Sequence, residues 1–349
     1  MGILGNKSIE WCERGLIPDR LARAGMRKLV AQRLVDEGIG DGEMRSERFN
    51  RFIDELRNSP IAINTDDANE QHYEVPAEFF HGHLGSHLKY SCCLYPQGNE
   101  ALDEAERLML ELYAERAGLK DGMRILDLGC GWGSLSLWLA QRYPNAQVVG
   151  LSNSYGQREF ILGQAKARGI CNLTIYTGSI VEFEMPAGEP PFDRALSIEM
   201  FEHMKNYGAL LAKLRPWLKS DGRLFVHIFV HKLLAYHFED KGSEDWMTRY
   251  FFSGGTMPSE HLLYHFQDDF SVARHWWVSG QHYEKTANQW LEKLDKRRAE
   301  LMPILQHCYG DEAAIWFQRW RMFYMAVAEL FGYNEGNEWG VGHYLLAPR

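Results

Sequence analysis

Short apolar runs recur about every 20 to 25 residues through the middle of the chain, and segments with helical periodicity separate them. Strands that alternate with helices predict a doubly wound, mainly parallel sheet with helices on both faces. Such sheets bind ligands at the carboxyl ends of their strands. The expected strands are residues 124–128, 147–151, 173–176, 193–198 and 223–229.

Residues 1–70 have the pattern of short polar helices. In one of them an apolar stripe runs beside a basic one. The stripes consist of Ala22, Met26, Leu29, Val30 and Leu34, and of Arg20, Arg23 and Arg27. We expect a helical extension that packs on the main domain, and a helix lying on a membrane surface is the alternative.

After about residue 231 the chain becomes rich in aromatic residues, and seven of the eleven tryptophans lie beyond residue 240. Two further strands are expected at 270–277 and 339–346, with a helical stretch from 286 to about 331 between them. This part predicts a helical cap and an aromatic-lined pocket. The expected domains are an extension over 1–70, a ligand-binding core over 71–230, and a substrate-binding cap with the final strands over 231–349.

Composition narrows the classes of function. The chain has 38 Lys and Arg against 47 Asp and Glu, and its net charge of −9 argues against nucleic-acid binding by broad phosphate neutralisation. No run approaches the roughly 18 apolar residues that span a bilayer, and the start lacks the apolar run of a secretory signal. We therefore expect a cytoplasmic protein without stable membrane insertion. The six cysteines show no metal-ligand spacing, which predicts free thiols and no metal; a homodimer stays open.

The sharpest local signal is a glycine-rich turn between the first strand and a helix. It reads Gly129-Cys130-Gly131-Trp132-Gly133. Glycine lets the backbone approach a ligand closely, and the helix N-terminus presents free N–H groups, so the turn is of a nucleotide-binding kind. Ser134 breaks the dinucleotide pattern. Asp127 before the turn, without a P-loop lysine, favours S-adenosylmethionine over NAD or ATP.

The flanking segments resemble a known family. Residues 72–80, 90–92 and 127–133 resemble the cyclopropane-fatty-acid-synthase-like superfamily of class I S-adenosylmethionine-dependent methyltransferases. Within it, the segments that resemble the coclaurine N-methyltransferases are 197–207, 235–240, 250–258 and 326–333. The resemblance covers nearly the whole chain. It implies a Rossmann-like α/β fold and S-adenosyl-L-methionine as cofactor, with S-adenosyl-L-homocysteine as its product.

The resemblance also implies a cofactor pocket. Tyr90 and Ser91 would approach the amino-acid end of the cofactor, and Asp127, Gly129 and Gly131 would lie behind it. Ser152, Asn153 and Gln157 would reach its ribose and adenine. No acidic residue ends the second strand, so Asn153 or Gln157 must bind the ribose instead. A solvated helix face is the alternative for Gln157.

Methyl transfer requires alignment, exclusion of water and an acceptor for the proton of the nucleophile. Glu202 and His203 follow the fourth strand at the ligand-binding edge, so we expect them to take the proton of an amine. Glu199 lies three residues before Glu202. If the segment is helical, both acids face one site and bind a cationic substrate. A carboxylate that caps the first turn of this segment is the alternative for Glu199.

The expected substrate-binding residues come from distant parts of the chain, and they are Glu74, His227, Phe229, Tyr283 and Phe331. His227 lies toward the end of the expected fifth strand, where the family places a side chain that faces the site. A buried core histidine is the alternative. Tyr283 and Cys92 correspond to active-site groups in the lipid-modifying branch of the family.

Three functions compete. The first is an N-methyltransferase of a small aromatic amine, such as a tetrahydroisoquinoline or an arylalkylamine. The second adds a methylene group to unsaturated phospholipid acyl chains, with bicarbonate held by Cys92, Glu202, His227 and Tyr283. The third is a silent binding module, against which the intact motifs argue. The lipid branch has a glycine at the position of Glu199 and a smaller aliphatic residue at that of Phe229, so these residues favour the amine.

Overall fold

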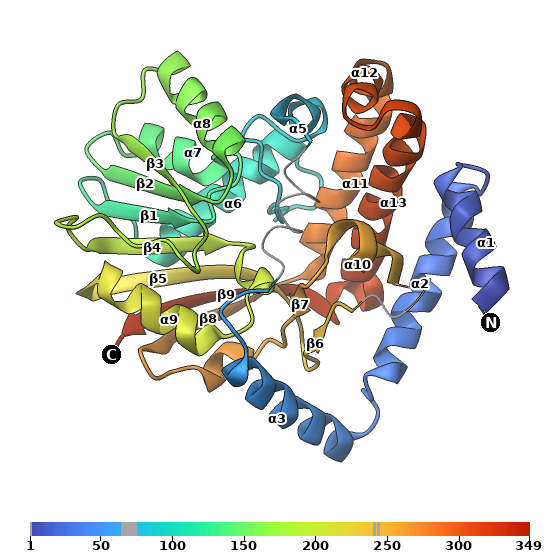
Figure 1. The fold of residues 1–349 in the computed structure, drawn as a ribbon, viewed down its shortest axis with the longest axis horizontal. Coiled ribbons are helices and arrows are strands. Elements are labelled where there is room, and N and C mark those ends of the chain that lie inside the picture. Colours follow the sequence, from blue (N-terminus) through green and yellow to red (C-terminus); the bar gives the residue numbers. More distant parts are fainter. Residues whose placement is uncertain (1, 64–74, 240–241, 243–244) are drawn as a thin grey trace.

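A mostly parallel sheet organises the chain in this computed structural model, which describes residues 2–63, 75–239, 242 and 245–349 (Figure 1). In this described part the sheet has seven strands, in the order β3-β2-β1-β4-β5-β9-β8. Their bounds are β1 Arg124–Leu128, β2 Gln147–Ser152, β3 Leu173–Thr177, β4 Phe192–Ile198, β5 Leu218–His231, β8 Phe270–Val278 and β9 Trp339–Pro348.

The strand order creates a switch point beside β1. The chain passes from β1 to β2 and β3, and then returns to β4 on the other side of β1. Strand β9 runs antiparallel to both of its neighbours, β5 and β8. The predicted doubly wound, mainly parallel sheet is therefore confirmed. A crevice opens at such a switch point, next to the carboxyl ends of β1 and β4.

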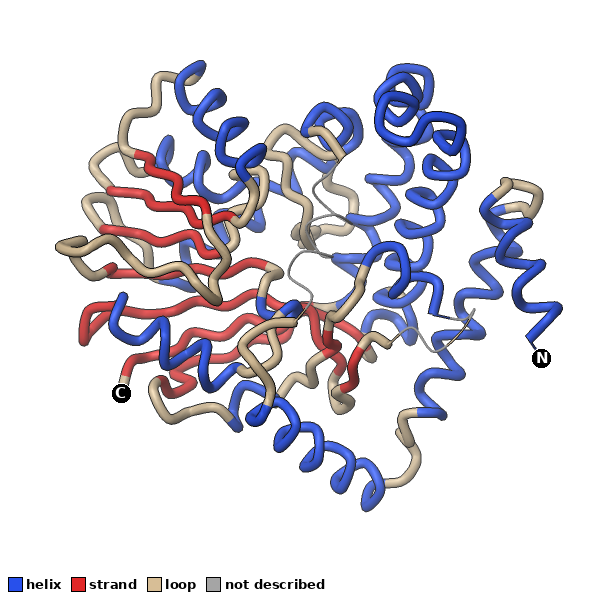
Figure 2. The backbone as a smooth tube through the Cα atoms, in the orientation of Figure 1, coloured by secondary structure: helices blue, strands red, loops and turns tan. Residues whose placement is uncertain are grey.

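Both faces of the sheet are buried, which explains why its strands are nearly continuous apolar runs. Alternate side chains of one strand enter different cores: Ile125 packs on one face and Leu126 on the other. Figure 2 shows helices on both sides of the sheet. The covering helices include α6 Leu102–Ala117, α7 Ser134–Arg142, α8 Tyr155–Ala167 and α9 Tyr207–Leu214.

The N-terminal helices are α1 Gly2–Glu13, α2 Asp19–Asp36 and α3 Gly42–Asn58. In α2, the apolar stripe contributes the buried side chains of Ala22 and Leu34. Arg23 and Arg27 form ion pairs with Glu329 at 2.9 and 2.5 Å. These arginines thus bind a helix of the same chain, whereas the membrane-surface alternative needs them free. Among the described residues, no helix is both long and apolar enough to cross a membrane.

The C-terminal helices are α10 Trp246–Phe251, α11 Gly280–Lys296, α12 Arg298–Tyr309 and α13 Ala313–Phe331. The expectation of one helical stretch from 286 is wrong in detail. Helix α11 begins at Gly280, where Ser279 accepts a hydrogen bond from the Gln281 N–H. A break at Gly310, with φ +54°, separates α12 from α13. The break lets α13 fold back along α11, and these helices stand beside the carboxyl edge of the sheet (Figure 1).

Short elements complete the region next to this edge. Helix α5 spans Ala77–His83, and β6 Tyr236–His237 pairs antiparallel with β7 Thr256–Met257. A single turn of 3-10 helix, η1 Phe201–His203, follows β4. These elements and the C-terminal helices surround the crevice that the switch point opens.

Candidate active site

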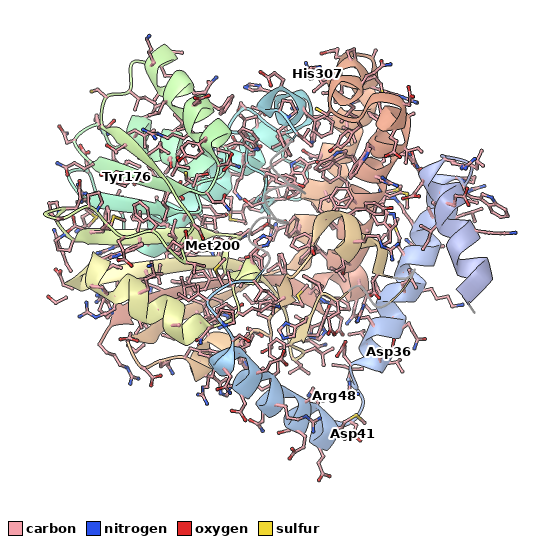
Figure 3. All side chains as sticks on the ribbon, in the orientation of Figure 1. Asp36, Asp41, Arg48, Tyr176, Met200 and His307 are labelled. Atoms are coloured by element: carbon pink, nitrogen blue, oxygen red, sulfur yellow. The ribbon has the colours of Figure 1, made fainter. Side chains whose placement is uncertain are left out.

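The glycine turn after β1 has backbone conformations that favour glycine at each of its glycines. Gly129, Gly131 and Gly133 have φ of +80°, +51° and +80°. A Cβ at Gly129 would lie 2.9 Å from Met200, whose position near the middle of the molecule is seen in Figure 3. A Cβ at Gly131 would meet no described atom within 4 Å. Gly131 therefore borders open space, into which a ligand can fit against the backbone.

That open space belongs to a cleft of about 850 Å³. Gly129, Gly131, Ser152, Asn153 and Gln157 line it, as sequence reasoning expected. Sequence reasoning missed other lining residues, among them Ile63, Ser179, Ile180, Met200 and Met204. The position of Ser179 just after β3, at the ligand-binding edge, is the signal that could have identified it.

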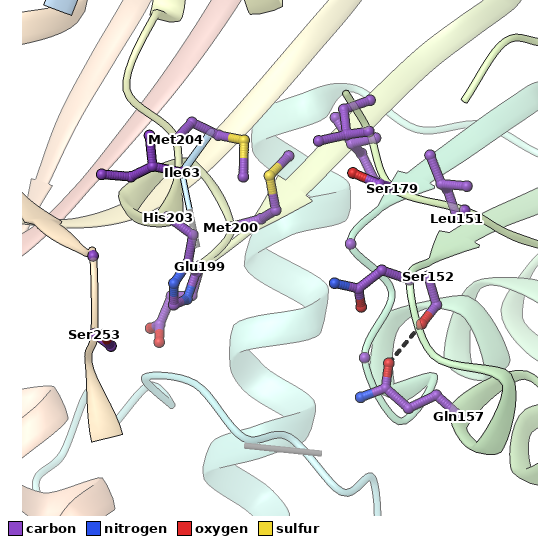
Figure 4. A pocket seen from close by; sticks show the side chains of 17 residues that line it. Ile63, Leu151, Ser152, Gln157, Ser179, Glu199, Met200, His203, Met204 and Ser253 are labelled. Carbon is purple, nitrogen blue, oxygen red and sulfur yellow. Dashed lines mark hydrogen bonds between the residues drawn. The ribbon is translucent and has the colours of Figure 1, made fainter. Parts of the chain in front are cut away.

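Gln157 is buried, so the alternative of a solvated helix face is wrong for it. Its Oε1 accepts a hydrogen bond of 2.6 Å from the Ser152 hydroxyl (Figure 4). Its Nε2 has no hydrogen-bond partner among the described residues. A buried donor of this kind needs an acceptor, such as a ribose oxygen or an adenine nitrogen.

A recess next to the cleft holds the remaining expected cofactor residues. Tyr90, Ser91 and Asp127 line it together with the turn glycines. The Asp127 carboxylate accepts a hydrogen bond of 2.6 Å from the Ser136 hydroxyl, and burial raises its pKa to about 6. The open cradle at Gly131 and the orphan amide of Gln157 thus fit S-adenosylmethionine.

An aromatic chamber of about 740 Å³ adjoins the cleft. Glu199 and His203 line both spaces, so the cleft and the chamber meet at these side chains. In Figure 4 they lie at one end of the cleft, away from Ser152 and Gln157. The chamber walls come from several elements and include Tyr90, Phe229, Phe238, Met247, Phe252, Met257, Tyr283, Trp290, Phe323, Val327, Leu330 and Phe331.

The chamber brings together Phe229, Tyr283 and Phe331 from the expected substrate residues. Glu74 lies outside the described residues. His227, expected to face the site, is not among the residues that line the chamber. Strand β5 continues to His231, so His227 lies within the strand rather than at its end, and its side chain is fully buried. Its Nε2 lies 3.0 Å from the Glu199 carboxylate, which lines the chamber.

Glu199 does not have the helical conformation that its spacing from Glu202 suggested. It lies between β4 and η1 with φ +49°, in the left-handed region. Its Oε1 accepts a hydrogen bond of 3.0 Å from the Cys92 N–H, and His227 Nε2 lies 3.0 Å from the same oxygen. Its Oε2 accepts one of 2.6 Å from the Tyr283 hydroxyl. These tertiary bonds hold the carboxylate in the chamber, so the capping alternative is also wrong.

Burial controls the protonation of the chamber groups. It raises the pKa of Glu199, and the Lys89 ammonium and the Tyr283 hydrogen bond oppose this rise. Burial and the charge of Glu199 raise the pKa of Glu202 well above its usual value. Burial lowers the pKa of His203 to about 4, so its imidazole is neutral at pH 7. The neutral imidazole of His203 can therefore accept an amine proton at pH 7, and Glu202 can accept one when its carboxyl is ionised.

Sequence reasoning missed Lys89, a lysine that is 1% exposed. Its Nζ donates hydrogen bonds to the Ser91 hydroxyl and, over 2.7 Å, to the Cys92 carbonyl, and it lies over the Tyr113 ring. The position directly before Tyr90 and Ser91 was the available signal. Across the ranges given above, no group of His, Cys, Asp or Glu could hold a metal ion.

Comparisons with known proteins agree with this geometry. The family model described as mycolic acid cyclopropane synthetase matches residues 62–337. An (S)-coclaurine N-methyltransferase from Thalictrum flavum subsp. glaucum is 40% identical over 342 residues, which are 97% of this chain and 94% of that protein. One from Papaver somniferum is 39% identical over 344 residues, or 97% of this chain and 96% of that one.

Solved structures give the same order of similarity. Coclaurine N-methyltransferase bound to N-methylheliamine and SAH matches with a TM-score of 0.93 at 38% identity, over 98% of this chain and 99% of that one. The cyclopropane synthase MmaA2 from Mycobacterium tuberculosis, at 23% identity and a TM-score of 0.68, shares the fold over 83% of this chain and all of that one. The chain therefore belongs to the mycolic acid cyclopropane synthetase family and, within it, to the S-adenosylmethionine-dependent N-methyltransferases related to coclaurine N-methyltransferase.

Proposed function

We propose that the protein transfers a methyl group from S-adenosylmethionine to the nitrogen of a small aromatic amine of the tetrahydroisoquinoline or arylalkylamine kind. The observation that carries this proposal is the Glu199 carboxylate held inside an aromatic chamber. A buried anion among aromatic faces favours a cationic amine both by charge and by cation–π attraction. The names of the relatives, coclaurine and pavine N-methyltransferase, point to the same class of substrate.

The contacts of the Glu199 carboxylate also disfavour the alternative function, the addition of a methylene group to unsaturated phospholipids. That chemistry requires bicarbonate held by Cys92, Glu202, His227 and Tyr283. In this chain the Cys92 N–H and the Tyr283 hydroxyl donate hydrogen bonds to the Glu199 carboxylate instead, and His227 Nε2 lies 3.0 Å from it. The side chain supplies the anion that a dissolved ion would otherwise provide, and an olefin would not compensate its buried charge.

The residues divide the work of methyl transfer between cleft and chamber. Gln157, Ser152 and Asn153 would hold the nucleoside, and Tyr90 and Ser91 the amino-acid end. When bound, S-adenosylmethionine supplies an electrophilic methyl group on a sulfonium. The apolar walls exclude water, which strengthens the electrostatic interactions inside.

Glu199 and Glu202 have different roles in the chamber: one stabilises positive charge and the other accepts a proton. An amine must lose its proton before it attacks. Glu202, with its raised pKa and an Oε2 that has no hydrogen-bond partner in the described chain, is suited to receive that proton. Neutral His203 is the second acceptor. In its ionised form, Glu199 stabilises the cationic product.

We expect Glu202→Gln and His203→Ala each to lower kcat for amine methylation by about 10²-fold, because general acid–base catalysis is worth that much when water can also take the proton. The affinity for S-adenosylmethionine should stay unchanged. Because the pKa of Glu202 is raised well above its usual value, its base form becomes abundant only at higher pH. We therefore expect kcat to rise with pH in the wild type and to rise less in Glu202→Gln.

Steady-state kinetics across pH and calorimetry of cofactor binding check this expectation. Glu338→Gln is the matched control, because it removes a buried carboxylate that pairs with Lys232 and does not line the chamber. Wild-type turnover in both chamber variants would assign Glu202 and His203 a structural role only.

The proposed function is tested by incubating the protein with S-adenosylmethionine, a panel of secondary arylalkylamines and vesicles of unsaturated phospholipid. Either reaction adds a net CH₂, so mass spectrometry must identify which substrate gains the mass. We expect the amine to gain it. A gain on the acyl chains with none on any amine would replace this function by lipid modification.

A further inference from the structure

A chain of hydrogen bonds runs from the outer part of the molecule to the Glu199 carboxylate. Arg116 Nη1 lies 2.7 Å from His343 Nδ1, and His343 Nε2 lies 2.8 Å from His227 Nδ1. His227 Nε2 lies 3.0 Å from Glu199 Oε1. Both histidines are fully buried and are register partners on β9 and β5. Arg116, on α6, is partly exposed, and its guanidinium lies over the Trp276 ring.

The chemistry of the guanidinium gives this chain a direction. A guanidinium only donates, so His343 Nδ1 must accept and the ring proton lies on Nε2. His343 then donates to His227 Nδ1, which places the proton of His227 on Nε2, facing Glu199. The Tyr113 hydroxyl, 2.9 Å from His227 Nδ1, can donate to the same atom. Each link thus points a proton toward the carboxylate.

We propose that Arg116 and His343 are positioning residues that act through His227 to hold Glu199 in its ionised form for a cationic amine. This inference rests on the proposed function, because it concerns the residue that would bind the amine. Burial and the nearby cations lower the pKa of His227 and His343 well below the usual value, so both rings are neutral, as the chain requires.

The direction of the chain also excludes a role as a proton exit. The guanidinium has no atom that accepts a proton, so the proton of the substrate cannot leave through Arg116. Without Arg116, His343 is free to place its proton on Nδ1. His227 can then carry its proton on Nδ1, with His343 Nε2 or the Tyr113 hydroxyl oxygen as acceptor, and in that tautomer its bare Nε2 faces Glu199 Oε1. The carboxyl must hold a proton to keep that contact, which raises its pKa.

Other groups also act on Glu199 and limit the size of the effect. They are Lys89 and Cys92 from the segment after α5, Glu202 and His203 from η1, His227 from β5, and Tyr283 from α11. The Lys89 ammonium still favours the ionised form when Arg116 is absent. We therefore expect a pH shift of about one unit rather than complete loss of activity.

The first test compares Arg116→Met with Arg116→Lys by the pH dependence of kcat/KM for an arylalkylamine. Arg116→Met should move the acid limb upward by about one pH unit, so that activity is lost first at low pH. Arg116→Lys keeps a cationic donor and should restore the wild-type limb. Arg274→Met is the matched control, since Arg274 also lies over the Trp276 ring but is exposed on β8.

The second test changes His343. In His343→Gln the amide oxygen can accept from Arg116 and the amide nitrogen can donate to His227, so the limb should stay in place. His343→Leu breaks the chain and should shift the limb as Arg116→Met does. A merely structural role would lower the melting temperature in these variants and leave the limb unmoved. If the acid limb of the kcat/KM profile lies at the wild-type pH in both Arg116→Met and His343→Leu, the proposal is overturned.

A measurement without turnover separates this proposal from the proposed function. Nitrogen NMR of ¹⁵N-histidine-labelled wild-type protein should show His227 protonated at Nε2. In Arg116→Met, the population protonated at Nδ1 should increase. A wild-type His227 protonated at Nδ1 would overturn the inference. Failure of the wild type to methylate any amine would instead overturn the proposed function and leave the NMR result to decide this one.

Discussion

Gly131→Val should abolish binding of S-adenosylmethionine while the protein stays folded. Gly131 borders the cleft, and a Cβ there meets no described atom of the protein within 4 Å, so a valine side chain would project into the space for the cofactor. We expect calorimetry to give a dissociation constant at least about 10³-fold higher than that of the wild type, or no measurable binding.

The backbone of Gly131 has φ +51°, so valine there also adds local strain. Gly169→Val measures that strain alone. Gly169 has φ +67°, a Cβ there also meets open space, and it is exposed after α8, outside the cleft. Both variants should lose similar stability on thermal unfolding, and Gly169→Val should keep its cofactor affinity. Unchanged affinity in folded Gly131→Val would remove the cofactor from this turn.

Glu199→Gly should lower kcat/KM for amines by about 10³-fold, because it removes the anion that we propose binds the substrate and stabilises the product. Glycine suits the φ of +49° at this position, so the backbone should be preserved. The substitution leaves a space for a small anion between the Cys92 N–H, His227 Nε2 and the Tyr283 hydroxyl. Added formate or bicarbonate should bind in that space and restore part of the rate.

Kinetics with and without formate test this prediction, and phospholipid vesicles test for a change of reaction. Glu202→Gly is the control. Glu202 Oε2 has no hydrogen-bond partner among the described residues, so this variant should not form a comparable anion site, and formate should not restore its rate. No cyclopropane product is expected from either variant. Wild-type constants for Glu199→Gly at every pH would exclude a substrate-binding role for Glu199.

The buried strands could be predicted because a parallel sheet covered on both faces needs apolar side chains at nearly every position. The residue at which β5 ends could not be predicted from the sequence. Its continuation to His231 depends on pairing with β9, where His231 meets Trp339, more than 100 residues later in the chain. This nonlocal pairing is why His227 was expected at the edge of the sheet and lies within it.

The site was predicted best where local sequence determines its shape. The glycines of the turn indicate a backbone conformation that other residues rarely adopt, so the position of the cofactor cleft could be predicted from Gly129 and Gly131. The conformation of Glu199 depends instead on partners from other elements, including Cys92 and Tyr283. The same holds for Lys89, since lysine is usually exposed and only the folded chain surrounds it.

The Glu199 carboxylate is covalently part of the chain, and this has a consequence for the supply of the anion. A dissolved ion must be captured from the medium, with the loss of its translational freedom, whereas a tethered group is present at a high effective molarity in every molecule. Saturation with carbon dioxide, or its removal, should therefore leave the wild-type rate unchanged. In this chain the position of the anion depends on the backbone and on the three groups that contact the Glu199 carboxylate.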